Sequence, residues 1–165
     1  MKTLGCLEPV SLPQLGVAEV FAKVDTGAFS GALHCTDIKV VRRGVVRKRY
    51  LKFTPLGNQK LATETDTFMK TYVRSATGHR IKRYIVDTQI IIQGRTYPIR
   101  IGLSDRSDLK RPVLIGRRFL RENSMLVDVR INQELDDEGE IYEGIEDIWP
   151  DYPTQEDFFF NEDEY

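Results

Sequence analysis

The sequence predicts a mostly β domain, either a small barrel or a sandwich, with one short helix near residues 117–123. Short β-prone runs follow one another along the first 131 residues, with turn-forming Gly, Pro, Asn and Ser residues between them. No helix-length segment with a 3.6-residue apolar period separates these runs, which argues against a doubly wound α/β domain. Only residues 117–123 combine helix-forming side chains with an apolar pair, Phe119 and Leu120.

The chain divides by charge into a basic domain, residues 1–131, and an acidic tail, residues 132–165. All 24 Lys and Arg residues lie at or before Arg130, while residues 131–165 hold 14 of the 25 acidic residues. The first 130 residues have 24 basic against 11 acidic side chains, a formal charge of +13, although the whole chain carries −1. The domain is large enough to bury a core of its own.

The sequence predicts a cytoplasmic protein. Cys6 and Cys35 are its only cysteines, too few for a disulfide framework, and the first residues lack the apolar run of a signal peptide. No apolar stretch is long enough to span a membrane.

The first 24 residues are expected to form a short strand, a turn and a second strand. Pro9 and Pro13 exclude a helix, residues 12–16 suggest a fixed bend, and residues 20–24 form the strand before Asp25. Further strands are expected where β-prone runs lie between turn residues: 32–41, 45–53, 71–74, 79–84, 85–92, 96–103, 112–116 and 125–131. Residues 59–70 and 104–111 are expected to be irregular, because they are polar or rich in turn residues.

A hairpin is expected at residues 71–84. Two alternating strands flank a cluster of small residues, and such a cluster with a glycine is typical of a hairpin tip. The tip consists of Ser75, Ala76, Thr77 and Gly78.

The candidate catalytic motif is Asp25-Thr26-Gly27-Ala28, which follows the strand at residues 20–24. It would hold a carboxylate at the end of a strand, beside a hydroxyl and a glycine that permits a tight turn. On its own the motif is weak evidence, since Asp and Gly together are common in turns that carry no chemistry.

The order of this motif, the glycine-tipped hairpin and a later apolar-apolar-Gly-Arg element resembles the retropepsins, the single-domain aspartic proteases. A narrower resemblance is to the bacterial and archaeal retropepsin-like family labelled "ATP-dependent zinc protease", whose genes often neighbour an ATP-grasp glutamate ligase. The stretches that carry it are Gly5-Cys6-Leu7-Glu8, Leu12-Pro13-Gln14-Leu15-Gly16, Ala22-Lys23-Val24 with the Asp25 motif, Ala32-Leu33-His34, Leu103-Ser104-Asp105-Arg106 and Leu114-Ile115-Gly116-Arg117.

This resemblance implies a small closed acid-protease barrel and an aspartic endopeptidase. Two close carboxylates that share one proton activate water and polarise the peptide carbonyl. The chain has one Asp-Thr-Gly, and Asp87-Thr88 is followed by Gln89, so the resemblance implies a homodimer with Asp25 from each subunit.

The resemblance also implies roles for the neighbouring residues. Thr26 would bond across the dimer axis, Gly27 and Ala28 would leave room in the cleft, and Gly116 with Arg117 would brace the loop. Residues 75–78 would form a flap over an extended peptide substrate.

Two features depart from the family. Phe29-Ser30-Gly31-Ala32 stands where the family has a basic residue and a run of Thr and Ser, which leaves catalysis open, and the acidic tail after Arg130 has no counterpart in it. The zinc and ATP of the family label find no motif here, since the chain has neither His-Glu-x-x-His nor a phosphate-binding glycine loop. The sequence therefore predicts no metal and no cofactor.

Other residues have simpler interpretations. His34 is expected to be hydrogen-bonded or at the surface, His79 solvated, and Cys35 a small core residue. The basic face has few aromatic residues for stacking, so nucleic acid is an unlikely partner and a solvated face or a dock for acidic segments is favoured. This basic face consists of Arg42, Arg43, Arg47, Lys48, Arg49, Arg80, Lys82 and Arg83.

The acidic tail mixes its charges with aromatic residues, which a purely solvating tail would hold in smaller number. Either it packs on the basic domain, in the same chain or across the dimer and even over the cleft, or it reaches a partner, or it is a disordered acidic segment. For the whole protein, the alternative to a peptidase is a retropepsin-fold module that binds extended or glutamate-rich peptides without cleaving them.

Overall fold

The computed structural model describes residues 1–74 and 76–137, and these are mostly β-strands. The strands are β1 (Thr3–Leu4), β2 (Leu7–Leu12), β3 (Val17–Asp25), β4 (Gly31–Arg43), β5 (Lys48–Pro55), β6 (Thr63–Thr65), β7 (Met69–Arg74), β8 (Arg80–Ile92), β9 (Arg95–Ser104), β10 (Val113–Gly116) and β11 (Leu126–Val127). The helical elements within these residues are α1 (Arg117–Glu122) and the 3-10 turns η1 (Pro13–Leu15), η2 (Gln59–Leu61) and η3 (Gln133–Leu135). The predicted mostly β fold with one short helix near residues 117–123 is confirmed.

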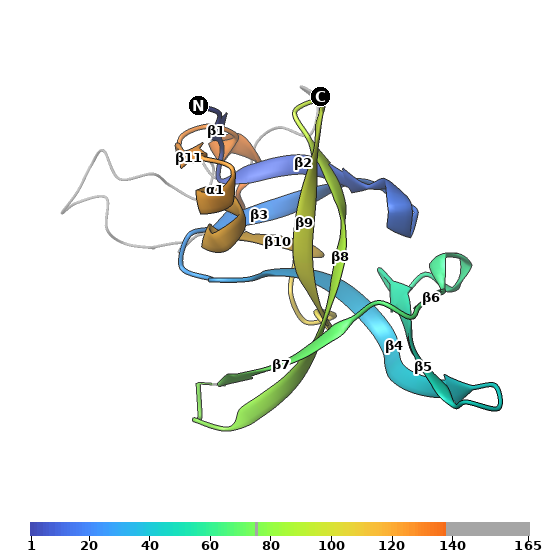
Figure 1. The fold of residues 1–165 in the computed structure, drawn as a ribbon. Helices are drawn as coiled ribbons and strands as arrows, with labels where there is room; N and C mark the ends of the chain where they lie inside the picture. Colours follow the sequence, from blue (N-terminus) through green and yellow to red (C-terminus); the bar gives the residue numbers. More distant parts are fainter. Residues whose placement is uncertain (75, 138–165) are drawn as a thin grey trace.

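Six strands form a closed barrel in the order β10-β3-β2-β8-β9-β4, and β4 returns to β10 (Figure 1). The short strand β10 closes the ring because it pairs on both sides. Val113 lies opposite Ala22 of β3 in parallel register and opposite Leu33 of β4 in antiparallel register. Closure removes unpaired edges from the ring, and it confirms the predicted retropepsin-like barrel.

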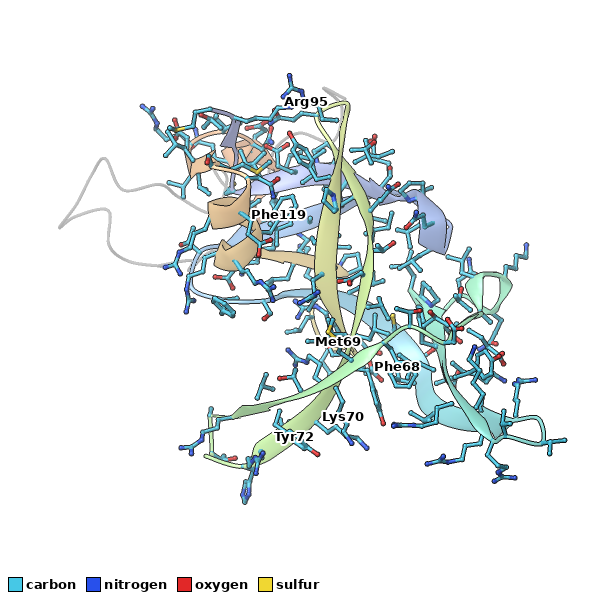
Figure 2. All side chains as sticks on the ribbon, in the orientation of Figure 1. Phe68, Met69, Lys70, Tyr72, Arg95 and Phe119 are labelled. Atoms are coloured by element: carbon cyan, nitrogen blue, oxygen red, sulfur yellow. The ribbon has the colours of Figure 1, made fainter. Side chains whose placement is uncertain are left out.

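The core fills the inside of this barrel. Successive strand residues point to opposite faces, and the inward set includes the fully buried Leu33, Ile90, Ile101 and Ile115. Helix α1 packs against the barrel through Phe119, whose ring meets Tyr97 edge to face at a centroid distance of 5.8 Å (Figure 2). Burying aromatic and branched side chains in this way supplies the main stabilisation of a small domain.

Two β arms extend from the barrel: the β4–β5 arm (residues 37–54) and the β7–β8 arm (residues 69–84) (Figure 1). They exist because β4 and β8 have 13 residues each and continue past the ring. Phe68 links them (Figure 2), since its ring lies 5.9 Å from that of Tyr84 and under the Arg49 guanidinium at 5.6 Å.

The structure corrects several element boundaries. The strand expected at 45–53 begins at Lys48, because the 44–47 segment is the turn and its Val45 and Val46 side chains are exposed. The stretch 59–70, expected to be irregular, contains η2, β6 and the start of β7.

Two more boundaries differ from the expectation. The strands expected at 79–84 and 85–92 are one strand, β8. Of the strand expected at 125–131 only Leu126–Val127 forms, since the Asp128 carbonyl accepts a turn hydrogen bond from the Ile131 amide. None of the described helices is long and apolar enough to cross a membrane.

Candidate active site

Asp25 is the last residue of β3, at one end of the barrel. Parallel pairing with β10 sets Gly116 opposite Asp25. The Gly27 amide donates to Asp25 Oδ1 at 2.9 Å, and the Ala28 amide donates to the Asp25 carbonyl at 3.2 Å. These two bonds fix both the carboxylate and the turn that follows it, and they leave Asp25 partly exposed.

The junction of β10 and α1 supports the Asp25 loop from behind. The Arg117 amide donates to the Ala28 carbonyl at 2.8 Å, and the Arg118 amide donates to the Phe29 carbonyl at 3.1 Å. Arg117 Nη1 adds a charge-assisted bond to the Gly27 carbonyl at 2.9 Å. The structure thus brings together the residues predicted to support the loop: Thr26, Gly27, Ala28, Gly116 and Arg117.

Two glycines allow the backbones of these segments to approach each other closely. A Cβ atom on Gly116 would lie 2.6 Å from the Phe29 carbonyl oxygen, and one on Gly31 would lie 2.8 Å from the Leu114 carbonyl oxygen. Both neighbours are main-chain atoms that cannot rotate away. Gly31 of the Phe29-Ser30-Gly31 segment is therefore required because no side chain fits between it and β10.

The outer side of the Asp25 loop faces solvent in the single chain. Thr26 and Gly27 are exposed, and the Phe29 side chain is 50% exposed. The Arg117 guanidinium lies over the Phe29 ring, 5.4 Å from its centroid. The loop therefore presents a carboxylate, a hydroxyl and an apolar ring together, a surface suited to contact with another chain.

The predicted flap residues lie at the tip of the β7–β8 arm. Ala76, Thr77 and Gly78 are exposed, and Ser75 lies outside the described residues. Gly78 has a φ of +85° with no atom within 4 Å of a Cβ placed there. Figure 1 places this tip at the far end of the arm, so the tip and the Asp25 loop are apart in the single chain.

Two arginines near Asp25 were not among the predicted site residues. Burial lowers the pKa of Arg106, the charge of Arg83 lowers it further, and the charge of Asp25 opposes both. The stem of Arg83 crosses Gly102, where a Cβ would lie 2.8 Å from Arg83 Cδ. The charge of Arg106 therefore interacts with that of the candidate catalytic carboxylate, and Arg83 lies close enough to Arg106 to act on it. The sequence showed Arg106 only as one residue of a family-like stretch, and Arg83 only as part of the basic face.

The remaining candidates have structural positions. His34 Nδ1 accepts a hydrogen bond from the Arg106 amide at 2.8 Å, so its 3.8 Å approach to Asp105 is not a salt bridge. Cys35 is fully buried, and burial raises its pKa to about 12, which removes it as a nucleophile at neutral pH. His79 is exposed. These three expectations are confirmed.

No metal-binding cluster is present in the part of the chain that the structure describes. Its His, Cys, Asp and Glu side chains do not gather in groups of three or more.

A groove lies between the roots of the two arms and is called the interarm groove below. It has a volume of about 480 Å³, and residues of β4, β8 and β9 line it together with Asp105. The lining includes apolar Ile38, Ile81, Tyr84 and Leu103 and basic Lys82 and Arg83. An apolar floor with positive charge suits an extended peptide that carries acidic groups.

Comparison with known families identifies this architecture. Residues 3–136 match the RimB-like family, described as retropepsin-like aspartic endopeptidase RimB. The chain belongs to this RimB-like family. The match covers the barrel, both arms and the Asp25 loop, in agreement with the retropepsin-like resemblance of the sequence.

Individual relatives add a second association. The chain is 28% identical over 137 residues to a protein of Parasynechococcus marenigrum named "Probable alpha-L-glutamate ligase", and 26% identical over 141 residues to one of the same name from Shewanella pealeana. These alignments cover 81% and 84% of this chain but only 29% and 31% of the relatives. A segment similar to this chain therefore forms less than a third of those longer proteins.

A solved structure shares the fold. Protein Lpg0085 of Legionella pneumophila, described as having unknown function, superposes with a TM-score of 0.56 at 26% sequence identity. The superposition covers 78% of this chain and 94% of that protein.

Proposed function

We propose that this protein is an aspartic endopeptidase whose catalytic dyad consists of Asp25 from each subunit of a homodimer. The observation that carries the proposal is the position of Asp25, held by the Gly27 amide at 2.9 Å at the end of a retropepsin-like barrel strand. The exposed Thr26 beside it is available to a second copy of the loop. One carboxylate per chain makes the site incomplete without that copy.

In this mechanism the two carboxylates share one proton, because two negative charges so close together do not both form. The ionised group removes a proton from water, and the protonated group donates to the peptide carbonyl oxygen. The water oxygen attacks the carbonyl carbon. As the C–N bond breaks, the leaving nitrogen takes up the proton that the first carboxylate removed from water, and the second carboxylate regains its proton from the hydroxyl formed at the carbonyl carbon. Residues 75–78 of each β7–β8 arm close over the substrate and exclude bulk water.

The substitution Asp25→Asn tests the mechanism, because it removes the titratable group and keeps the size of the side chain. We expect peptide hydrolysis to fall by at least about 1,000-fold, with unchanged thermal unfolding and dimer mass. Asp87→Asn is the matched control, since Asp87 also precedes a threonine but pairs with Arg100 on the exposed face of β8 and β9. Hydrolysis that survives Asp25→Asn would rule out the aspartic mechanism.

The second candidate is a module that binds extended or glutamate-rich peptides without cleaving them. The positive charge of Lys82 and Arg83 in the interarm groove, and of Arg106 within charge interaction of Asp25, favours this candidate. The relatives named glutamate ligase support an ATP-grasp glutamate ligase as a functional neighbour in either case. A protein that hydrolyses no peptide, and that binds acidic peptides equally well with and without the Asp25→Asn substitution, would be such a module.

A further inference from the structure

The first residues of the acidic tail lie against the loop of residues 105–112. Lys110 and Arg111 both form ion pairs with Asp137, and Arg111 Nη2 also donates to the Leu135 carbonyl at 2.9 Å. Asp137 and Lys110 are 44% and 48% exposed, so the ion pairs lie at the surface, whereas the Arg111 side chain is 14% exposed and its bond to the Leu135 carbonyl is partly buried. The root of the tail is therefore held against residues 105–112.

The same loop leads back to Asp25 and to the interarm groove. Arg106 Nε donates to the Arg111 carbonyl at 3.3 Å, and the charge of Arg106 interacts with that of Asp25. At its start the loop contributes Asp105 to the lining of the groove. One short segment thus carries the root of the tail at one end and a wall of the groove at the other.

The chemistry of the tail complements the groove and the arms. Residues 138–165 contain eleven acidic side chains and no Lys or Arg. The two arms, residues 37–54 and 69–84, hold twelve Lys and Arg side chains and one acidic residue, Asp37. In the ion pairs of the described residues, only Arg43 and Lys48 among these basic side chains have partners, which are Glu64 and Asp66. The tail segment 156–164 places three consecutive phenylalanines between acidic residues, which matches a groove with an apolar floor and a basic side.

Length does not limit such a contact. The 28 residues after Asp137 can span about 90 Å when extended, far more than a small domain requires. Asp105 is the one acidic side chain in the groove lining, and its carboxylate already accepts from the Ser107 amide at 2.9 Å.

We propose that residues 156–164 of the tail occupy the interarm groove of their own chain and act as a built-in competitor of acidic peptides. The phenylalanines 158–160 lie on Ile38, Ile81 and Leu103, and the flanking carboxylates face Lys82 and Arg83. That the competitor inhibits hydrolysis rests on the proposed peptidase function. The docking itself does not.

Trp149 provides the measurement, because it is the only tryptophan of the protein and lies in the tail. In the full chain with Asp25→Asn, so that nothing is cleaved, we expect acrylamide quenching of Trp149 to be weak at low salt. Raising NaCl to about 0.5 M screens the pairing and should raise the quenching constant at least about twofold. The double substitution Lys82→Glu and Arg83→Glu should raise the quenching constant of Trp149 by the same factor at low salt.

Two controls make the outcome specific. Arg95→Glu with Arg121→Glu changes the same charge on exposed residues outside both arms, with Arg95 at the opposite end of the sheet (Figure 2), and should leave the quenching unchanged. Replacing Phe158, Phe159 and Phe160 with serine should release the tail without altering the domain. This variant keeps the test valid if the groove variant fails to fold, as judged by circular dichroism.

A labelled peptide of residues 156–164 added to these proteins completes the test. This peptide should bind the serine variant about fivefold more tightly than it binds the protein with the unaltered tail, because the groove of the serine variant is empty. Equal quenching in all proteins, or equal effects of groove and control charges, would overturn the proposal. If the protection of Trp149 from acrylamide disappears on dilution, the tail occupies the groove of a second copy and the proposal is overturned. If the labelled peptide binds equally to the serine variant and to the protein with the unaltered tail, the groove is free for an occupant from another protein, which also overturns the proposal.

Discussion

The Asp25 loop and the tip of the β7–β8 arm are both turns that contain glycine, but they are held in opposite ways. At the Asp25 loop, Gly116 faces main-chain atoms of Phe29 and Ser30 at less than 3 Å from a would-be Cβ. At the arm tip, a Cβ placed on Gly78 would meet no atom within 4 Å apart from its chain neighbours, and only its φ of +85° requires glycine. The loop is therefore fixed by contact with other segments, whereas the tip is shaped by its own backbone.

This difference agrees with the roles proposed for the two turns. A catalytic carboxylate must be held in place so that little reorganisation accompanies the reaction. A flap must move to admit and cover a substrate, and few contacts resist the movement of an exposed arm. Substitutions that act on one kind of restraint and not the other therefore test whether the two turns are held in different ways.

The largest effect is expected from Gly116→Ala. The added methyl group overlaps the Phe29 carbonyl and forces the Asp25 loop away from β10, at a cost of about 3 kcal/mol of unfolding free energy. Thermal unfolding should show a midpoint lower by about 6–12 °C. Gly44→Ala is the control, since the β4–β5 turn is open. A loss no larger than that of the control would mean that the loop is not packed as described.

The sequence predicted the position of the loop better than its surroundings. Asp25 stood out locally as a carboxylate after a strand, but its proposed catalytic role and the supporting role of Gly116 and Arg117 came from the resemblance to the retropepsins. Arg83 and Arg106 were missed because they come from different segments, and only the tertiary fold brings the charge of Arg106 within reach of both Arg83 and Asp25. Such convergence depends on tertiary structure and leaves no periodic signal.

The barrel strands were predictable because local sequence patterns mark them, but the residues at which the strands begin and end were harder to predict. Alternating apolar residues identify most strands, but Val45 and Val46 show that β-prone residues can occupy a turn. There Gly44 and Arg47, both with positive φ, determine the backbone. The dimer, the dyad and the role of residues 75–78 remain predictions.

An intermediate effect is expected from Arg117→Ala. It removes the bond to the Gly27 carbonyl and the contact with the Phe29 ring, which together should stabilise the fold by about 1–2 kcal/mol. Peptide hydrolysis should fall mainly through kcat, because the carboxylate position is loosened. Arg117→Lys should recover the charge but little of the activity, since lysine lacks the planar donor fork.

Arg118→Ala is the neighbouring control. Arg118 forms an exposed i,i+4 pair with Glu122 at 3.0 Å, and such pairs contribute about 0.3–0.5 kcal/mol. Urea unfolding and steady-state kinetics of the three variants measure both effects. If Arg117→Ala and Arg118→Ala behave alike, Arg117 does not support the loop.

The smallest stability effect, and the most specific functional one, is expected at the arm tips. Gly78→Ala and Gly44→Ala each place a methyl group at positive φ in open space, so each should cost about 1 kcal/mol. Only Gly78 lies in the proposed flap. Gly78→Ala should therefore raise KM for a peptide several-fold, while Gly44→Ala leaves it unchanged. Equal KM values would show that the β7–β8 tip does not contact the substrate, even if Asp25 is catalytic.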